Sequence, residues 1–365
     1  MKSTVLFEAD APLHPGMSGS CAGELFAQYR AIVQSPDLRW TTHYHKVRLL
    51  GKGGQGLVYL CERQDTNRFS LPVALKVFSP ESYGNAEEYA EDMGRIEGIA
   101  ARVALLQHDN LLDIHGFIEQ DGIRIMEMEW VDGFNLEEVL TQRMLDLTQE
   151  RVHPEHWEYV RNVIITAGPA QPRLKPGIAI QVLRECLAAL AALHREGIVH
   201  GDVKPSNIML KRTGSAKVID LGSATDADRA SASRHLSPAY AAPEVLRGGE
   251  KTPQSDLASL GYVLIEMLAG RSPFDGLDTY HKLIEAKADL YGRLSEMLPP
   301  EVSGNEVLLH LCRRLVASDP ARRFPSALAA DLDRKGAVDF HRQLVKGNLA
   351  SEYENDLRVW LEKLG

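Results

Sequence analysis

The chain has 365 residues, of which 44% are hydrophobic and 25% are charged, and its formal net charge at pH 7 is -9. This length is too great for one small core and favours two lobes, or one bilobal domain with extensions. The acidic balance argues against nucleic acid as the main partner, because phosphate binding needs clustered Lys and Arg.

The cysteines and the apolar segments indicate in which cellular compartment the protein is found. The four cysteines are far apart in the chain and form no paired or zinc-binding pattern, which fits a reducing environment. The longest apolar run, residues 182–193, contains Arg184 and Glu185 and is too short to cross a bilayer. No signal-peptide core follows the N-terminus. We therefore expect a cytoplasmic protein without a membrane span.

A glycine-rich turn follows the first strand-like segment, and its spacing is G-x-G-x-x-G-x-V (Gly51, Gly53, Gly56 and Val58). Glycines suit a phosphate-binding loop, because side chains would keep backbone N–H groups away from a phosphate. The next strand-like segment, residues 71–78, carries Lys76 among apolar neighbours that include Ala74. A plain hairpin turn and a surface lysine are the alternatives, and the apolar neighbours argue against the second.

Residues 198–222 place several polar side chains between short apolar segments. One tight loop and the segment after it carry a base, a cation and two oxygen ligands for a metal (Asp202, Lys204, Asn207 and Asp220). Each of these residue types is commonplace in a loop by itself. Their joint order behind the glycine-rich turn and Lys76 is far more specific.

This order closely resembles eukaryotic-like Ser/Thr protein kinases, whose patterns include H-R-D-x-K-P-x-N followed by D-F-G. Two departures stand out, because Gly201 occupies the position of the arginine and Leu221 that of the phenylalanine. Three later segments also resemble family patterns, namely T-P-x-Y-x-A-P-E, S-D-x-x-S-L-G and D-P-x-x-R (237–244, 255–261 and 319–323). The resemblance covers roughly residues 44–330.

The resemblance implies ATP and Mg²⁺ as cofactors, with Mn²⁺ as an alternative ion. Asp202 would align a substrate hydroxyl and accept its proton, and Lys204 would neutralise the γ-phosphate. Asn207 and Asp220 would hold the metal, and Lys76 would reach the α- and β-phosphates.

The resemblance also implies a nucleotide site. The glycine-rich turn, Val58 and Ala74 would surround the nucleotide, Met128 would close the back of the site, and the backbone of Glu129 and Val131 would hold the adenine. An expected helix over residues 87–107 would supply a carboxylate to pair with Lys76.

Glu97 is our choice for that partner and Glu91 is the competitor. Structural roles are implied for Ser237, which would contact Asp202 and Lys204, and for Asp256, which would fasten the backbone of the catalytic loop. Arg323 would form a buried bridge with Glu244.

The fold class expected is therefore α+β, a bilobal protein kinase. Residues 44–131 would form a small antiparallel sheet with one helix, and residues 132–330 a mostly helical lobe with an insert at 146–177. Residues 1–43 would be an extension with a short helix at 23–33. Residues 331–365 would form a helical tail that packs on the large lobe or docks a partner.

The two departures carry expectations of their own. Gly201 cannot grip a phosphate, so activity should not depend on phosphorylation of Thr225, Ser231 or Ser233 through the usual arginine. Leu221 keeps an apolar contact, so that change should be tolerated.

The function expected is transfer of the ATP γ-phosphate to Ser or Thr of a protein substrate, autophosphorylation included, with no nucleic-acid partner. A regulatory partner could bind the extensions or the insert. One alternative is a pseudokinase that acts as a nucleotide-binding scaffold, and the presence of Lys76, Asp202 and Asp220 argues against it. A small-molecule phosphotransferase is the other alternative, and the peptide-docking segment at 237–244 argues against that one.

Overall fold

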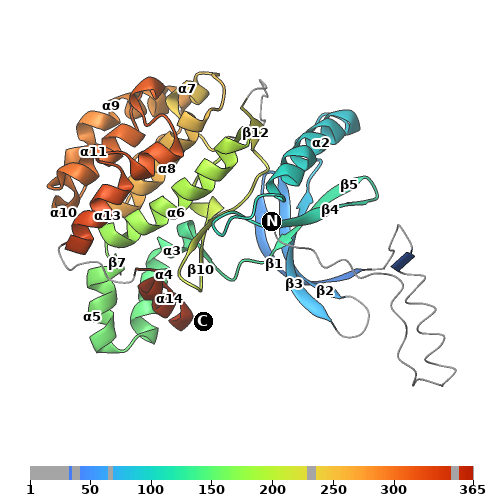
Figure 1. Cartoon of the computed structure of the whole chain (residues 1–365), viewed down its shortest axis with the longest axis horizontal. Helices are drawn as coiled ribbons and strands as arrows, with labels where there is room; N and C mark the ends of the chain where they lie inside the picture. Colours follow the sequence, from blue (N-terminus) through green and yellow to red (C-terminus); the bar gives the residue numbers. More distant parts are fainter. Residues whose placement is uncertain (1–32, 35–41, 65–68, 228–235, 347–352, 365) are drawn as a thin grey trace, which may run out of the picture. The chain divides into compact units, whose positions relative to one another are not determined.

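The computed structural model describes residues 33–34, 42–64, 69–227, 236–346 and 353–364 (Figure 1). Two compact units are distinguished, one comprising Met1–His45 with Arg63–Leu71 and the other Lys46–Glu62 with Pro72–Gly365. Every residue discussed below as part of the site belongs to the second unit. The short helix expected at 23–33 lies almost entirely outside the described residues.

The N-terminal part is a five-stranded sheet in the order β1-β2-β3-β5-β4 (β1 His43–Gly53, β2 Gly56–Gln64, β3 Ser70–Phe78, β4 Ile114–Gln120 and β5 Ile123–Glu129). Strand β5 pairs antiparallel with both β3 and β4. The register sets Ala74 opposite Met128 and Lys76 opposite Met126. This alternation gives Lys76 apolar strand neighbours, as the sequence indicated.

A single long helix, α2 (Ala86–Val103), accompanies this sheet. It begins at Asn85, whose side chain accepts a hydrogen bond from the Glu88 N–H and so caps the helix. Its buried residues Met93, Ile96 and Ala100 recur at helical spacing. The helix ends at Val103, four residues before the predicted end, because the last turn closes on backbone bonds within residues 102–106.

The C-terminal part is mainly helical (β6 Gly133–Asn135, α3 Leu136–Val139, α4 Gln142–Arg151, α5 Pro154–Val163, β7 Ile165–Thr166, β8 Arg173–Leu174, α6 Pro176–Arg195, β9 Ile198–Val199, η1 Pro205–Asn207, β10 Ile208–Lys211, β11 Ala216–Val218, β12 Thr225–Asp226, α7 Pro243–Leu246, α8 Pro253–Ala269, α9 Tyr280–Met297, α10 Pro300–Ser303, α11 Glu306–Leu315, η2 Pro320–Arg322 and α12 Ala327–Leu332). Helices α3 and α4 are separate, although they follow one another closely in the chain. Thr141 caps the N-terminus of α4 and thereby interrupts the run.

Helices α6 and α8 pack together in the core of this part. Among the described residues, α6 is the one helix long and apolar enough to cross a membrane, and 67% of its apolar window is buried inside the fold. Such burial is what a core helix of a globular domain shows. Helix α6 ends at Arg195, and Gly197, with φ +67, turns the chain into β9.

Two small antiparallel ladders fix the loops that follow α6. Strand β9 pairs with β12, and β10 pairs with β11 on one side and β6 on the other. The loop between β9 and β10 and the loop between β11 and β12 are therefore held at adjacent strand ends. These are the loops that carry the predicted chemistry.

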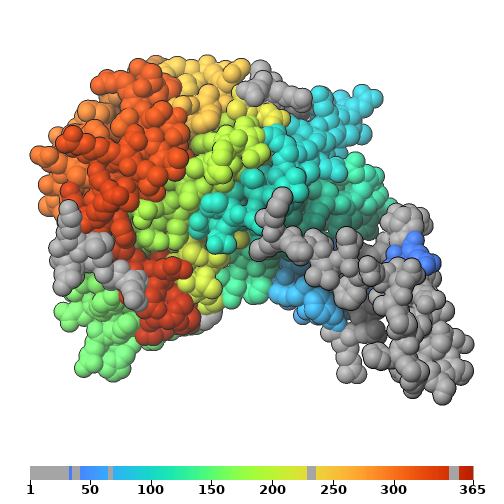
Figure 2. All heavy atoms as spheres, viewed as in Figure 1, coloured from blue at the N-terminus to red at the C-terminus, as the bar shows by residue number. Residues whose placement is uncertain are grey.

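Helices α13 (Ala337–Lys346) and α14 (Tyr353–Lys363) end the chain. Trp360 of α14 is fully buried, and its indole N–H donates to the Thr148 hydroxyl of α4 at 3.1 Å. Tyr159 of α5 also donates to Asp356 at 2.7 Å. Figure 2 shows α14 lying directly against the insert. The described part of the tail therefore packs on the large lobe, which is the first of the two predicted alternatives.

Candidate active site

Asp256, near the start of α8, fastens the loop that follows β9. Its carboxylate accepts hydrogen bonds from the His200 N–H at 2.9 Å and the Gly201 N–H at 2.8 Å. The His194 ring lies 2.9 Å from the same carboxylate. His200 is fully buried and its ring contacts the Ile219 carbonyl. The prediction that Asp256 fastens the backbone of the catalytic loop is therefore confirmed.

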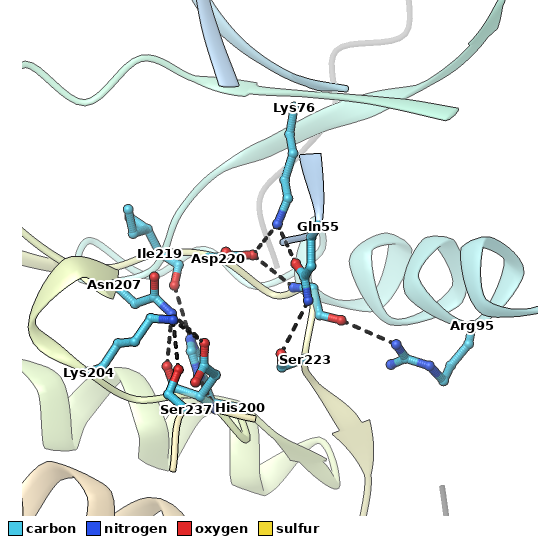
Figure 3. Close-up of polar contacts among 12 residues, drawn as sticks. Gln55, Lys76, Arg95, His200, Lys204, Asn207, Ile219, Asp220, Ser223 and Ser237 are labelled. Carbon is cyan, nitrogen blue, oxygen red and sulfur yellow. Dashed lines mark hydrogen bonds and ion pairs between the residues drawn. The ribbon is translucent and has the colours of Figure 1, made fainter. Parts of the chain in front are cut away.

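This loop brings three of the predicted residues together (Figure 3). The Lys204 Nζ lies 2.8 Å from a carboxylate oxygen of Asp202 and donates to the Ser237 hydroxyl at 2.9 Å. The Asn207 side-chain amide donates to the Asp202 carbonyl at 2.8 Å. The side chain of Asp202 is only 11% exposed. A carboxylate beside one fixed ammonium group can align a hydroxyl and accept its proton.

Asp220, at the end of the next segment, pairs with Lys76 of β3. The Lys76 Nζ lies 2.6 Å from Oδ1 of Asp220, and the Gly222 N–H donates to the same oxygen at 3.0 Å. Burial alone would raise the pKa of Asp220, but these two donors lower it to about 2. The residue adopts φ +66, a left-handed conformation that non-glycine residues rarely take and that recurs at functional sites.

Glu97 does not pair with Lys76, so that prediction is wrong for this structure. Both Glu97 and the competitor Glu91 are exposed on α2. Helix α2 buries the face that carries Ile96. Glu97 is the next residue and is exposed to solvent. Among the described residues, the hydrogen-bonding partners of the Lys76 ammonium group are Asp220 and Gln55.

Gln55, which lies inside the glycine-rich turn, was not predicted as a site residue. Its side-chain oxygen accepts a hydrogen bond from Lys76 at 2.7 Å, and its amide donates to Ser223 at 3.3 Å. A β-carbon on Gly222 would lie 1.8 Å from the Gln55 oxygen, so a side chain at position 222 would displace the Gln55 side chain from this place. The tip of the turn thus reaches the segment that carries Asp220. The signal in the sequence that could have identified Gln55 is its position as a polar residue between Gly54 and Gly56.

Two arginines of α2 were also missed. Arg95 points toward the segment after Asp220 (Figure 3). It donates to the carbonyls of Gly222 (3.2 Å) and Ala224, and its Nε lies 2.7 Å from Asp92. Arg102, two helical turns later on α2, pairs with Asp226. Helix α2 therefore offers guanidinium groups to the segment after Asp220, where the sequence suggested a carboxylate for Lys76.

The glycine-rich turn itself has one position at which glycine is obligatory. Gly56 has φ +135, and a β-carbon there would lie 2.0 Å from the Val77 carbonyl of β3. Gly51 and Gly53 have open space beside them, with no described atom within 4 Å of a β-carbon position. Val58 is half-buried on the strand that leaves the turn.

The connection after β5 contains the residues predicted to hold an adenine. Met128 is 6% exposed, Val131 is half-buried, and the Glu129 N–H donates to the Asp113 carbonyl at 2.9 Å. The Glu129 carboxylate pairs with Lys217, which is 4% exposed. This pair, in which Lys217 is buried and Glu129 is partly exposed, joins the connection after β5 to β11.

The oxygen donors present fit a hard divalent cation. Asn207 uses its side-chain amide nitrogen toward Asp202, which leaves its side-chain oxygen for another partner. Asp220 uses Oδ1 for Lys76 and Gly222, and its carboxylate has a second oxygen. Carboxylate and amide oxygens are ligands that magnesium accepts. Asn207 and Asp220 are the residues that would hold such an ion.

The segment at 237–240 is fixed from the large lobe. Tyr240 donates to Glu266 of α8 at 2.7 Å, and the fully buried Lys287 of α9 donates to the Ala239 carbonyl at 2.6 Å. The Lys287 Nζ also lies 3.8 Å from the centre of the Phe274 ring. A segment held at consecutive residues can present a stable surface to a peptide.

Replacing Glu97 with Gln is expected to leave kcat/KM within about threefold of wild type, because an exposed side chain without a contact to Lys76 contributes little. A steady-state assay with varied ATP checks this. A loss of a hundredfold or more would mean that Glu97 reaches Lys76 in the catalytic conformation.

Comparison with known proteins agrees with this geometry. The sequence matches the protein kinase domain over residues 44–331. Serine/threonine-protein kinase PrkC of Bacillus subtilis is 30% identical over 311 residues, which cover 83% of this chain and 42% of PrkC. Serine/threonine-protein kinase PknD of Mycobacterium tuberculosis is 32% identical over 289 residues, or 78% of this chain and 38% of PknD. Probable serine/threonine-protein kinase PknB of Lactococcus lactis is 27% identical over 309 residues.

The chain belongs to the protein kinase family. The antiparallel sheet followed by a helical part is the expected α+β kinase fold. Membership implies the use of ATP and of a divalent metal ion. The chain spans about two fifths of the length of these curated relatives.

Proposed function

We propose that this chain is an ATP-dependent protein kinase that phosphorylates Ser or Thr of protein substrates and of itself, with Mg²⁺ as the preferred ion. The observation that carries the proposal is the meeting of Asp202, Lys204 and Asn207 in one loop beside the Lys76–Asp220 pair. The relatives named as serine/threonine kinases support Ser and Thr hydroxyls as the phosphate acceptors. The free, buried cysteines at 61, 186 and 312 are consistent with a cytoplasmic location.

Catalysis in this proposal depends on positioning and charge. Asp202 accepts a hydrogen bond from the substrate hydroxyl and then its proton, while Lys204, whose Nζ lies 2.8 Å from the Asp202 carboxylate, neutralises charge on the transferred phosphate. Lys76 binds the phosphates that remain on the nucleotide. Asn207 and Asp220 would hold magnesium, which would neutralise negative charge on the phosphates when bound.

The remaining residues of the site would bind the nucleotide. The backbone of the glycine-rich turn would cover the phosphates where Gly51 and Gly53 leave open space. The backbone at Glu129 and Val131 would hold the adenine edge. The segment at 237–240 would receive the peptide around the acceptor hydroxyl.

The alternative function is a nucleotide-binding scaffold without transfer. One observation favours it, because Lys76 contacts Gln55 and Asp220 and no described carboxylate of α2. The Asp202–Lys204 arrangement favours the kinase, since a scaffold has no need of a base beside the phosphate site.

The test is incubation of the purified chain with γ-labelled ATP and Mg²⁺, alone and with a generic protein substrate. We expect label on Ser and Thr of both proteins, its loss on chelation of the metal, and weaker transfer with Mn²⁺. Saturable nucleotide binding without any transferred label would overturn the kinase proposal in favour of the scaffold. Label on small molecules alone would assign a different substrate class.

A further inference from the structure

Gly201 stands beside the catalytic Asp202, and a second residue fills the space that its missing side chain leaves. Gly201 has φ +72, and a β-carbon there would lie 2.7 Å from Cδ and 2.9 Å from Nζ of Lys251. The side chain of Lys251 therefore runs along the catalytic loop at the one position where the loop has no side chain. The substitution to glycine and the location of this lysine are sterically linked.

The ammonium group of Lys251 reaches the segment that follows Asp220. It donates to the Ser223 carbonyl at 3.2 Å. Arg95 of α2 binds the flanking carbonyls of Gly222 and Ala224. Three consecutive carbonyls are thus held by two cations, one on α2 and one directly before α8. Side chains of the chain itself therefore hold the backbone that follows Asp220.

Lys251 is also joined to the base of the catalytic loop. It immediately precedes Thr252, the N-terminal cap of α8, and α8 carries Asp256, which binds the loop backbone. Burial lowers the pKa of Lys251 to about 8, Asp202 and Asp256 act in the opposite direction, and Arg95 adds to the lowering. Lys251 therefore brings positive charge near Asp202 at neutral pH.

We propose that Lys251 is a positioning residue for phosphoryl transfer, which ties the catalytic loop at Gly201 to the segment after Asp220 from within the chain. In the family pattern the arginine beside the catalytic Asp performs such a link through a phosphate on the activation segment. Here the link is made by a lysine that is about fifty residues further along the sequence. The inference rests on the proposed kinase function, and it predicts activity that does not require a phosphorylated activation segment.

The test compares Lys251→Met with Lys251→Arg, and uses Lys282→Met as the matched control. Lys282 is an exposed lysine paired with Asp278 on the same large lobe. We expect Lys251→Met to lower kcat at least tenfold while KM for ATP stays within about threefold, because the ammonium group touches no predicted phosphate ligand. Lys251→Arg should restore most of kcat, and Lys282→Met should match wild type.

Two further measurements separate positioning from general stability. Amide hydrogen exchange at residues 219–227 should accelerate in Lys251→Met and not in Lys282→Met, while the thermal midpoint of Lys251→Met remains close to wild type. Wild type treated with a phosphatase should keep its activity. This exchange measurement needs no enzymatic activity, so it remains informative if the kinase proposal itself fails.

Three outcomes overturn the inference. They are kcat of Lys251→Met within twofold of wild type, failure of Lys251→Arg to restore kcat, and loss of wild-type activity after phosphatase treatment. Complete absence of transfer by wild type would instead refute the proposed function, and the exchange rates would then decide the role of Lys251 alone.

Discussion

Replacing Asp202 with Asn is expected to lower kcat by about three orders of magnitude, the scale of general base catalysis, while the affinity for ATP stays within about threefold. Asparagine has nearly the same size, so the loop should keep its shape. It lacks the negative charge that pairs with Lys204 at 2.8 Å and cannot accept the hydroxyl proton. The measurement is a steady-state assay together with nucleotide titration.

The control for this change is Asp278→Asn. Asp278 also pairs with a lysine, at 2.9 Å, but its side chain is 74% exposed and far along the chain from the catalytic loop. That variant should retain wild-type kinetics. More than a tenth of wild-type kcat in Asp202→Asn would show that another group accepts the proton, and would remove the main support for the catalytic assignment.

The catalytic loop was predictable because its chemistry is local in sequence. Asp202, Lys204 and Asn207 lie within six residues, so their spacing alone brings them together once the loop is anchored. Asp256 anchors the loop by binding its backbone N–H groups, a role that the sequence analysis also predicted. The antiparallel sheet was equally predictable, because the family resemblance implied it for residues 44–131, where β4 and β5 lie.

The partner of Lys76 was not predictable in the same way. A pairing between a helix and a strand depends on the rotation of the helix about its axis, and a shift of one residue turns a side chain by about 100°. Ile96 is buried on α2 and Glu97, one residue later, is exposed. The helix also ends earlier than the periodicity suggested. Sequence spacing could not fix this rotation.

Gln55, Arg95 and Lys251 share a different reason for being missed. Each makes its contact with a segment that is not its neighbour in the sequence, and none is one of the residues that define a motif. Gln55 meets Ser223 across 168 positions and Arg95 meets Ala224 across 129. Polar side chains of this kind are usually solvated, so only the three-dimensional arrangement shows that they converge on residues 222–224.

Their convergence has a consequence for control of the enzyme. The segment after Asp220 is bound by Arg95 from α2 and by Lys251 from the large lobe, and Gln55 contacts it from the glycine-rich turn. A movement of α2 would therefore act on the metal-binding segment through Arg95. In most of the family the corresponding connection would run through a carboxylate and Lys76.

The buried pair between Arg323 and Glu244 should dominate the stability of the large lobe. Arg323 is fully buried and binds both carboxylate oxygens of Glu244, at 2.6 and 2.8 Å. It also donates to the carbonyls of Ala317 and Gln254. The predicted bridge is confirmed. Arg323→Ala is expected to lower the free energy of unfolding by about 3–5 kcal/mol, because it leaves Glu244 uncompensated and several carbonyls unpaired.

Urea unfolding measures this change, and Arg342→Ala is its control. Arg342 pairs with Asp339 at 3.2 Å but is 64% exposed, so its removal should change the free energy of unfolding by less than about 0.5 kcal/mol. The double variant Arg323→Ala/Glu244→Ala should lose less than the sum of the single variants, since each single change already breaks the pair. A loss below about 1 kcal/mol in Arg323→Ala would contradict the assignment, because a buried cation with this many acceptors cannot be removed at so small a cost.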